Sequence, residues 1–197
     1  MDEADLIRQA KRHNLNAFNE LVLLYQDMAY NVAYRIMGEG VSAADATQDA
    51  FISAYEKLHT FADDTNFKAW LLRIVTNKCY DMLKYNKRRP GSSLDEMTEE
   101  NESSKWLVGD GAQPEEEQEV GEMVAAVQHC LDALPDDQRI VAILCDVEGY
   151  DYNAAAEIAA TSLGTIKSRL SRARAKLRDC LRDFAELLPD KYRSVEQ

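Results

Sequence analysis

The feature that most constrains this chain is a segment without apolar periodicity that divides it into two parts. Residues 91–118 are rich in Gly, Ser, Glu and Pro, and from Ser92 to Glu122 eleven acidic residues accompany a single Lys. Such a segment buries too little apolar surface to offset the entropy lost on ordering. We therefore predict a flexible acidic linker over 91–118, between an N-terminal domain over 1–90 and a C-terminal domain over 119–197.

Both parts show the apolar spacing of helices, and neither shows an alternation long enough for a strand. The expected helices cover residues 18–38, 43–59, 67–90, 120–134, 140–149, 151–160 and 163–188. Ser42, Asp151 and Ser162 stand where side chains cap helix N-termini. The sequence thus predicts an all-α fold of two small helical domains.

Composition excludes several classes of protein. The chain has 197 residues, a net charge of −12 and 46% hydrophobic residues, which is ordinary for a globular protein. No apolar run approaches the ~20 residues that span a bilayer, and the N-terminus lacks a signal-peptide layout, so we expect a cytoplasmic protein without membrane insertion. The four cysteines are scattered without a CxxC, so we predict reduced thiols rather than disulfides or a metal site. They are Cys79, Cys130, Cys145 and Cys180.

Basic residues gather in two blocks of this acidic chain. Lys68 to Arg89 holds seven bases and one acid, and Leu163 to Arg178 holds six bases and no acid. A field of one sign attracts a polyanion locally even when the whole molecule repels it. Two such blocks favour two contacts with one nucleic acid, with solvated helix faces as the alternative.

The last two expected helices have the layout of a helix-turn-helix. Ile166, Leu170, Ala173 and Leu177 form a narrow apolar stripe, and polar and basic residues occupy the rest of the surface. A helix in a major groove places small polar residues toward base edges and cations toward phosphates. The alternative is a solvated basic helix.

The block from Lys68 to Tyr85 mixes bases with aromatic residues, as single-stranded DNA requires for stacking and for backbone contacts. Trp70 lies in the apolar stripe, which is more typical of a core residue than of a stacking platform. Phe61 and Phe67 bracket a polar loop. The helix at 43–59 carries acidic residues opposite its apolar side, which is either a solvated face or a docking surface for a basic partner.

No catalytic motif is present: the chain has no Gly-rich phosphate loop, HExxH or serine elbow, so we expect neither an enzyme nor a cofactor.

Five blocks in this order resemble the extracytoplasmic-function (ECF, group IV) sigma factors of the sigma-70 family. They are AFNELVLLYQDMAYNVAYRIMGE, DATQDAFISAYEKLHTF, FKAWLLRIVTNKCYDMLKYNKRR, LPDDQRIVAILCDVEGYDY and SLGTIKSRLSRARAKLR. The resemblance implies a sigma-2 domain over 1–90 and a sigma-4 domain over 119–197. It also implies an alternative sigma factor that binds core RNA polymerase, recognises −35 and −10 promoter elements and melts DNA. Core polymerase (clamp helices and flap), promoter DNA and an anti-sigma factor are the implied partners.

The resemblance assigns roles by motif position. The residues implied to bind core polymerase are Asp45, Gln48, Asp49 and Phe51. Those implied to bind the single-stranded −10 element are Phe61, Asn66, Phe67, Lys68, Arg73, Asn77, Lys78 and Lys84. Those implied to bind the duplex −35 element are Thr165, Lys167, Ser168, Arg169, Arg172, Arg174 and Lys176.

The chain also departs from the family pattern. Ala160-Thr161 stands where a Gly is usual in the turn of the helix-turn-helix, so we expect a different turn geometry there. Two other functions stay open on the residues alone: a stand-alone helix-turn-helix regulator of duplex DNA, and an acidic interaction module that binds neither DNA nor polymerase.

Overall fold

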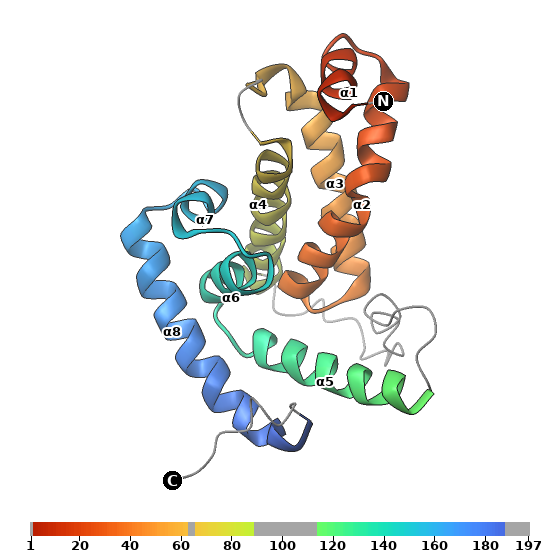
Figure 1. Cartoon of the computed structure of the whole chain (residues 1–197). Coiled ribbons are helices and arrows are strands. Elements are labelled where there is room, and N and C mark those ends of the chain that lie inside the picture. Colours follow the sequence, from red (N-terminus) through yellow and green to blue (C-terminus); the bar gives the residue numbers. More distant parts are fainter. Residues whose placement is uncertain (1, 63–65, 89–113, 188–197) are drawn as a thin grey trace.

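The structure, a computed structural model, describes residues 2–62, 66–88 and 114–187, and every regular element in these ranges is helical (Figure 1). The N-terminal group comprises α1 (Glu3–Ala10), α2 (Leu15–Met37), α3 (Gly40–Lys57), the 3-10 turn η1 (Leu58–Thr60) and α4 (Phe67–Arg88). The long helices α2, α3 and α4 pack side by side, and α1 packs on α2. Sequence reasoning missed α1, although Leu6, Ile7 and Ala10 have helical spacing and are buried.

The C-terminal group comprises α5 (Pro114–Asp132), α6 (Asp136–Ala142), the π-helical turn η3 (Ile143–Val147), α7 (Tyr152–Ile158), α8 (Leu163–Leu181) and the 3-10 turn η4 (Arg182–Leu187). Helix α5 begins at Pro114, inside the range predicted as linker, since proline suits the first turn of a helix. The rest of the predicted linker, 91–113, lies outside the described residues.

Two of the three predicted helix caps are confirmed. The carboxylate of Asp151 accepts hydrogen bonds from the amides of Asn153 and Ala154, and the hydroxyl of Ser162 accepts one from the amide of Thr165. The prediction for Ser42 was wrong. Helix α3 begins earlier, at Gly40, and the Ser42 hydroxyl instead donates to the carboxylate of Glu39.

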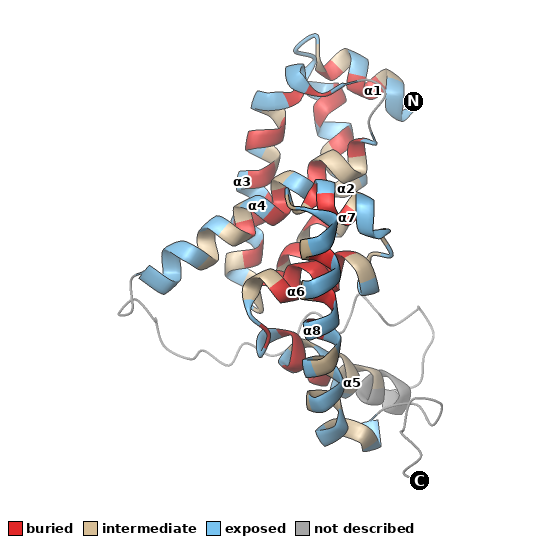
Figure 2. Ribbon diagram, turned by 90° about the vertical axis from the view of Figure 1, so that its left-hand side faces the viewer, coloured by how far each residue is buried: buried red, intermediate tan, exposed pale blue. Residues whose placement is uncertain are grey.

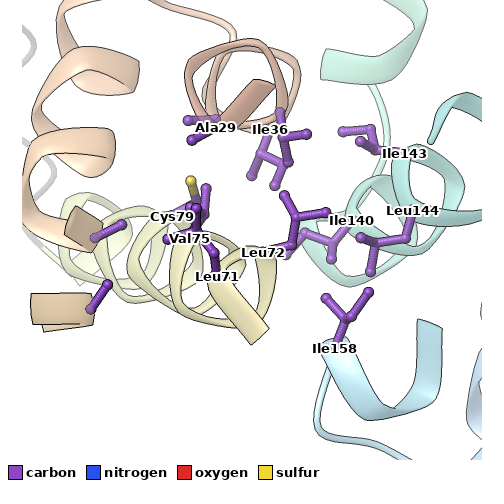
Figure 3. Close-up of a cluster of buried hydrophobic side chains, with 14 of the residues drawn as sticks. Ala29, Ile36, Leu71, Leu72, Val75, Cys79, Ile140, Ile143, Leu144 and Ile158 are labelled. Atoms are coloured by element: carbon purple, nitrogen blue, oxygen red, sulfur yellow. The ribbon is translucent and has the colours of Figure 1, made fainter. Parts of the chain in front are cut away.

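The two groups of helices share one hydrophobic core, as the close-up in Figure 3 shows. Ile36 of α2 and Leu72 of α4 meet Ile140 of α6 and Ile158 of α7 in this core. Figure 2 shows the same buried band continuing from the N-terminal group into α6 and the neighbouring part of α8. Both predicted helical modules are therefore present, and they are packed against each other.

Within the described ranges, no helix combines the length and apolar character that crossing a membrane requires.

Candidate nucleic-acid interface

Helices α7 and α8 form the helix-turn-helix, and the turn between them is left-handed at Ala160, with a φ of 48°. We had expected the absence of glycine to change this turn. That expectation was wrong: alanine occupies the left-handed conformation, at a cost of about 1–2 kcal/mol. The surrounding hydrogen bonds hold it there, since the amide of Thr161 donates to Ala156 O at 2.9 Å and that of Ala160 to Glu157 O at 3.3 Å.

Three of the four residues of the predicted apolar stripe of α8, Ile166, Leu170 and Ala173, are at most 1% exposed, and the fourth, Leu177, is partly buried against the same core. The side chains of Lys167, Ser168, Arg172, Arg174 and Lys176 are exposed, and those of Thr165 and Arg169 are half-buried. Burial of one side of α8 therefore turns the predicted −35 residues outward as one surface.

Two arginines of this surface are engaged in ion pairs within the chain. Arg169 lies 2.9 Å from Asp137 of α6, and Arg174 makes two contacts with the Asp146 carboxylate, at 2.6 and 3.1 Å. Hydrogen bonding to Asp146 raises the pKa of the Arg174 guanidinium. In the described part of the chain, no ion pair engages Lys167, Arg172 or Lys176, so these three cations are available to phosphates.

The predicted −10 residues of α4 also divide into exposed side chains and side chains that have a contact within the chain. Arg73 and Asn77 are exposed. Lys78 lies 3.8 Å from Asp49 of α3, Lys84 stacks on its neighbour Tyr80 with Nζ 4.1 Å from the ring centre, and Lys68 lies 5.7 Å from the ring of Tyr150.

The two phenylalanines that bracket the predicted −10 loop are core residues. Phe61 and Phe67 are 4% and 3% exposed, with ring centres 5.5 Å apart. Trp70 is half-buried and packs on both rings, at 5.3 and 5.6 Å, as its place in the apolar stripe predicted. The amide of Ala69 donates to Asn66 Oδ1 at 3.1 Å, so Asn66 supports the start of α4. Residues 63–65 of the loop lie outside the described residues.

Two of the four predicted polymerase-binding residues line a groove of about 470 Å³ between α2 and α3. Gln48 and Phe51 line this groove, whereas Asp45 is exposed outside its lining and Asp49 pairs with Lys78. Sequence reasoning missed the α2 side of the groove, which includes Val22, Gln26, Asp27, Tyr30 and Asn31. These side chains flank the buried stripe of α2, so helical spacing in the sequence could have identified them.

The two predicted DNA-binding surfaces meet where the helical groups pack. Asn77 of α4 and Arg169 of α8 line the same cavity, of about 220 Å³, together with Asp137 and Thr161. Tyr150 covers Lys68 nearby. The packing therefore brings one residue of each predicted DNA-binding surface, Asn77 and Arg169, to the same cavity.

The prediction of four reduced thiols was wrong for two of them. Cys130 of α5 and Cys180 of α8 form a disulfide across 50 residues of sequence, while Cys79 and Cys145 are free. Local spacing in the sequence does not reveal this pair, because the two cysteines come together only when the C-terminal group folds.

Comparison with known proteins places both groups of helices in one family. Residues 21–89 match sigma-70 region 2 and residues 125–177 match sigma-70 region 4. The chain is 34% identical over 181 residues to the ECF RNA polymerase sigma factor SigW of Bacillus subtilis, covering 90% of this chain and 96% of that protein. It is 33% identical over 170 residues to the ECF RNA polymerase sigma-E factor of Escherichia coli K12, covering 86% and 88% respectively.

Solved structures of sigma factors have the same fold. The sigma factor RpoE in complex with the anti-sigma factor NepR from Bartonella quintana matches with a TM-score of 0.65 and 27% identity, over 83% of this chain and 96% of that one. CnrH in complex with the cytosolic domain of CnrY matches with a TM-score of 0.62 and 26% identity, over 91% and 96%. The chain belongs to the ECF sigma factors of the sigma-70 family, and it is an alternative sigma factor that binds promoter DNA.

Proposed function

We propose that this sigma factor reads the −35 element with the exposed side of α8 and the melted −10 element with the exposed side of α4. The observation that carries the −35 assignment is that the side chains of Lys167, Ser168 and Arg172 are exposed on a helix whose opposite side is buried. Arg169 and Arg174 are positioned by Asp137 and Asp146, so they contribute to DNA binding only when these pairs exchange for phosphate.

On α4, Arg73 and Asn77 are the side chains most open to single-stranded DNA. Phe61 and Phe67 are buried, so they shape the floor of the −10 site rather than stack on bases directly. Lys68, Lys78 and Lys84 each have an intramolecular contact that a DNA phosphate replaces on binding. Because Asn77 and Arg169 share one cavity, simultaneous binding of both promoter elements requires the two helical groups to separate.

The groove between α2 and α3 is the proposed contact with the clamp helices of core RNA polymerase. It combines Phe51 and Val22 with the polar side chains of Gln48 and Gln26. The exposed Asp45 supplies negative charge beside it. The C-terminal group is proposed to contact the polymerase flap. The solved RpoE structure is a complex with the anti-sigma factor NepR, which supports the proposal that such a partner also controls this chain in the cytoplasm.

Run-off transcription with bacterial core polymerase on a library of randomised promoters tests this function. We expect transcripts that require this protein and share two spaced motifs. Lys167→Ala and Arg172→Ala should each lower the yield, whereas Arg182→Ala, a charge-matched control in η4 beyond the proposed DNA surface, should not. Tight binding of duplex DNA without polymerase, with no transcript in its presence, would instead support a stand-alone regulator.

A further inference from the structure

The contact between α5 and the distal half of α8 is built differently from the rest of the C-terminal group. The buried side chains of α8 are Ile166, Leu170 and Ala173. From Arg174 to Leu181, no side chain of α8 is buried. In this half of the helix, Leu177 is the side chain that packs, partly buried, against the shared hydrophobic core.

The disulfide between Cys130 and Cys180 is the fixed link at this contact. Cys130 is 1% exposed and follows Ala126 by one helical turn on α5, but neither residue belongs to the continuous core. The rings of His129 and Phe184 make a neighbouring edge contact, with centres 5.6 Å apart. The disulfide is thus a covalent link between α5 and α8 beside this ring contact.

Helix α5 also reaches the N-terminal group. Gln128 Nε2 donates to Arg35 O at 3.3 Å, near the end of α2. The Asp132 carboxylate lies beside Gly38, where an added Cβ would come within 2.7 Å of Asp132 Oδ1. The disulfide thus holds α5 between the distal half of α8 and the end of α2.

We infer that Cys130 and Cys180 form a redox site whose disulfide fastens α5 to the distal half of α8 and whose reduction releases α5. A dithiol reductant supplies two electrons and two protons: the S–S bond breaks to give two thiols, and the dithiol becomes a disulfide. Hydrogen peroxide reverses the change, since two thiols form the S–S bond while the peroxide O–O bond breaks to give two waters. The sulfur of Cys180 is the accessible one, because Cys180 is partly exposed and Cys130 is buried.

Reduction acts on one part of the molecule. The first half of α8, with Lys167, Ser168 and Arg172, stays on the core through Ile166 and Leu170. The freed part comprises α8 beyond Ala173 and α5 up to Cys130, including the contact of Gln128 with Arg35. Leu131 stays buried in the shared core, and Arg139 still donates to the carbonyl of Asp132.

Hydrogen exchange on the full chain, after hydrogen peroxide and after dithiothreitol, tests this inference. After dithiothreitol, we expect amides of residues 120–130 and 174–187 to exchange at least tenfold faster, with residues 163–173 unchanged. Cys180→Ser should show the fast exchange under both conditions. Cys145→Ser, which alters a free and partly exposed thiol, should behave as the unmodified chain does.

A count of free thiols under denaturing conditions accompanies the exchange data: two of the four after peroxide and all four after dithiothreitol. Four thiols after peroxide, or a disulfide that peptide mapping assigns to other cysteines, would overturn the inference. So would equal exchange in the two states. None of these measurements needs polymerase or promoter DNA, so their outcome is independent of the proposed function.

Discussion

Arg139 of α6 donates a 2.6 Å hydrogen bond from Nη1 to the carbonyl oxygen of Ile36, in the last turn of α2. Its Nη2 donates to Asp132 O at 2.9 Å and to Leu134 O at 3.3 Å, at the end of α5. Carbonyl oxygens in the last turn of a helix accept no hydrogen bond within the helix, so they need donors from elsewhere. One guanidinium, 7% exposed, therefore satisfies two helix ends from different groups and joins the two groups.

Arg139→Ala should lower the free energy of unfolding by about 2–4 kcal/mol, because it leaves buried carbonyl oxygens without donors and removes a packed side chain. Urea denaturation measures this change. Arg8→Ala is the matched control, since Arg8 is exposed and pairs only with its neighbour Asp5 and a local carbonyl. The control should stay within about 0.5 kcal/mol of the unmodified protein. A similarly small change for Arg139→Ala would contradict the bridging role.

The left-handed conformation of Ala160 predicts that a substitution by glycine, which usually destabilises a protein, stabilises this one. Ala160→Gly should stabilise the chain by about 0.5–1 kcal/mol, because glycine adopts a φ of 48° without the steric cost that alanine has there. Ala175→Gly, in the regular part of α8, should instead destabilise it by about 1 kcal/mol. Thermal unfolding of both variants gives the comparison, and two changes of the same sign would show that the turn is not strained.

The buried thiol of Cys79 makes stability depend on alkaline pH. Burial raises the pKa of Cys79 from 9.0 to about 12, so the folded chain keeps a proton that the unfolded chain releases in this window. The unfolded state then binds fewer protons, and stability falls as pH rises from 9 toward 12. Below pH 9 the thiol of Cys79 is protonated in both the folded and the unfolded chain, so the stability that depends on this proton is fully present.

Cys79→Ala removes this dependence. Between pH 9 and 10.5, the unfolding free energy of the unmodified chain should fall more steeply than that of the variant, by up to about 1.4 kcal/mol per pH unit. Urea titrations at a series of pH values measure both slopes, and all other titrating groups are common to the two proteins. Parallel slopes would mean that the thiol ionises in the folded chain as it does in the unfolded one.

The fold was largely predictable because helical periodicity and caps are local signals. The stripe Ile166, Leu170, Ala173 and the cap at Ser162 were both read from the sequence and confirmed. What escaped prediction depends on contacts between distant parts of the chain. The Cys130–Cys180 disulfide and the bond from Arg139 to Ile36 join residues 50 and 103 positions apart, and no local pattern records such a pairing.

The sequence predicted which residue types form the candidate site, but it did not show which of these side chains are available to bind DNA. Helical spacing placed Arg169, Arg172 and Arg174 on the outer side of α8, but only the structure shows that Asp137 and Asp146 engage two of them. The acidic partners come from α6 and η3: Asp146 lies 28 positions before Arg174, and Asp137 lies 32 positions before Arg169.

This difference in availability should be visible in the salt dependence of DNA binding. Each phosphate contact adds about 0.9 to the slope of log affinity against log salt concentration. Arg172→Ala should therefore lower the slope by about 1, since Arg172 is exposed and unengaged by any described acid. Arg174→Ala should leave the slope nearly unchanged while reducing stability, because Arg174 already neutralises Asp146. Fluorescence anisotropy of the polymerase complex on promoter DNA, across a salt series, gives both slopes. Equal losses for the two variants would show that Arg174 leaves Asp146 for the DNA backbone on binding.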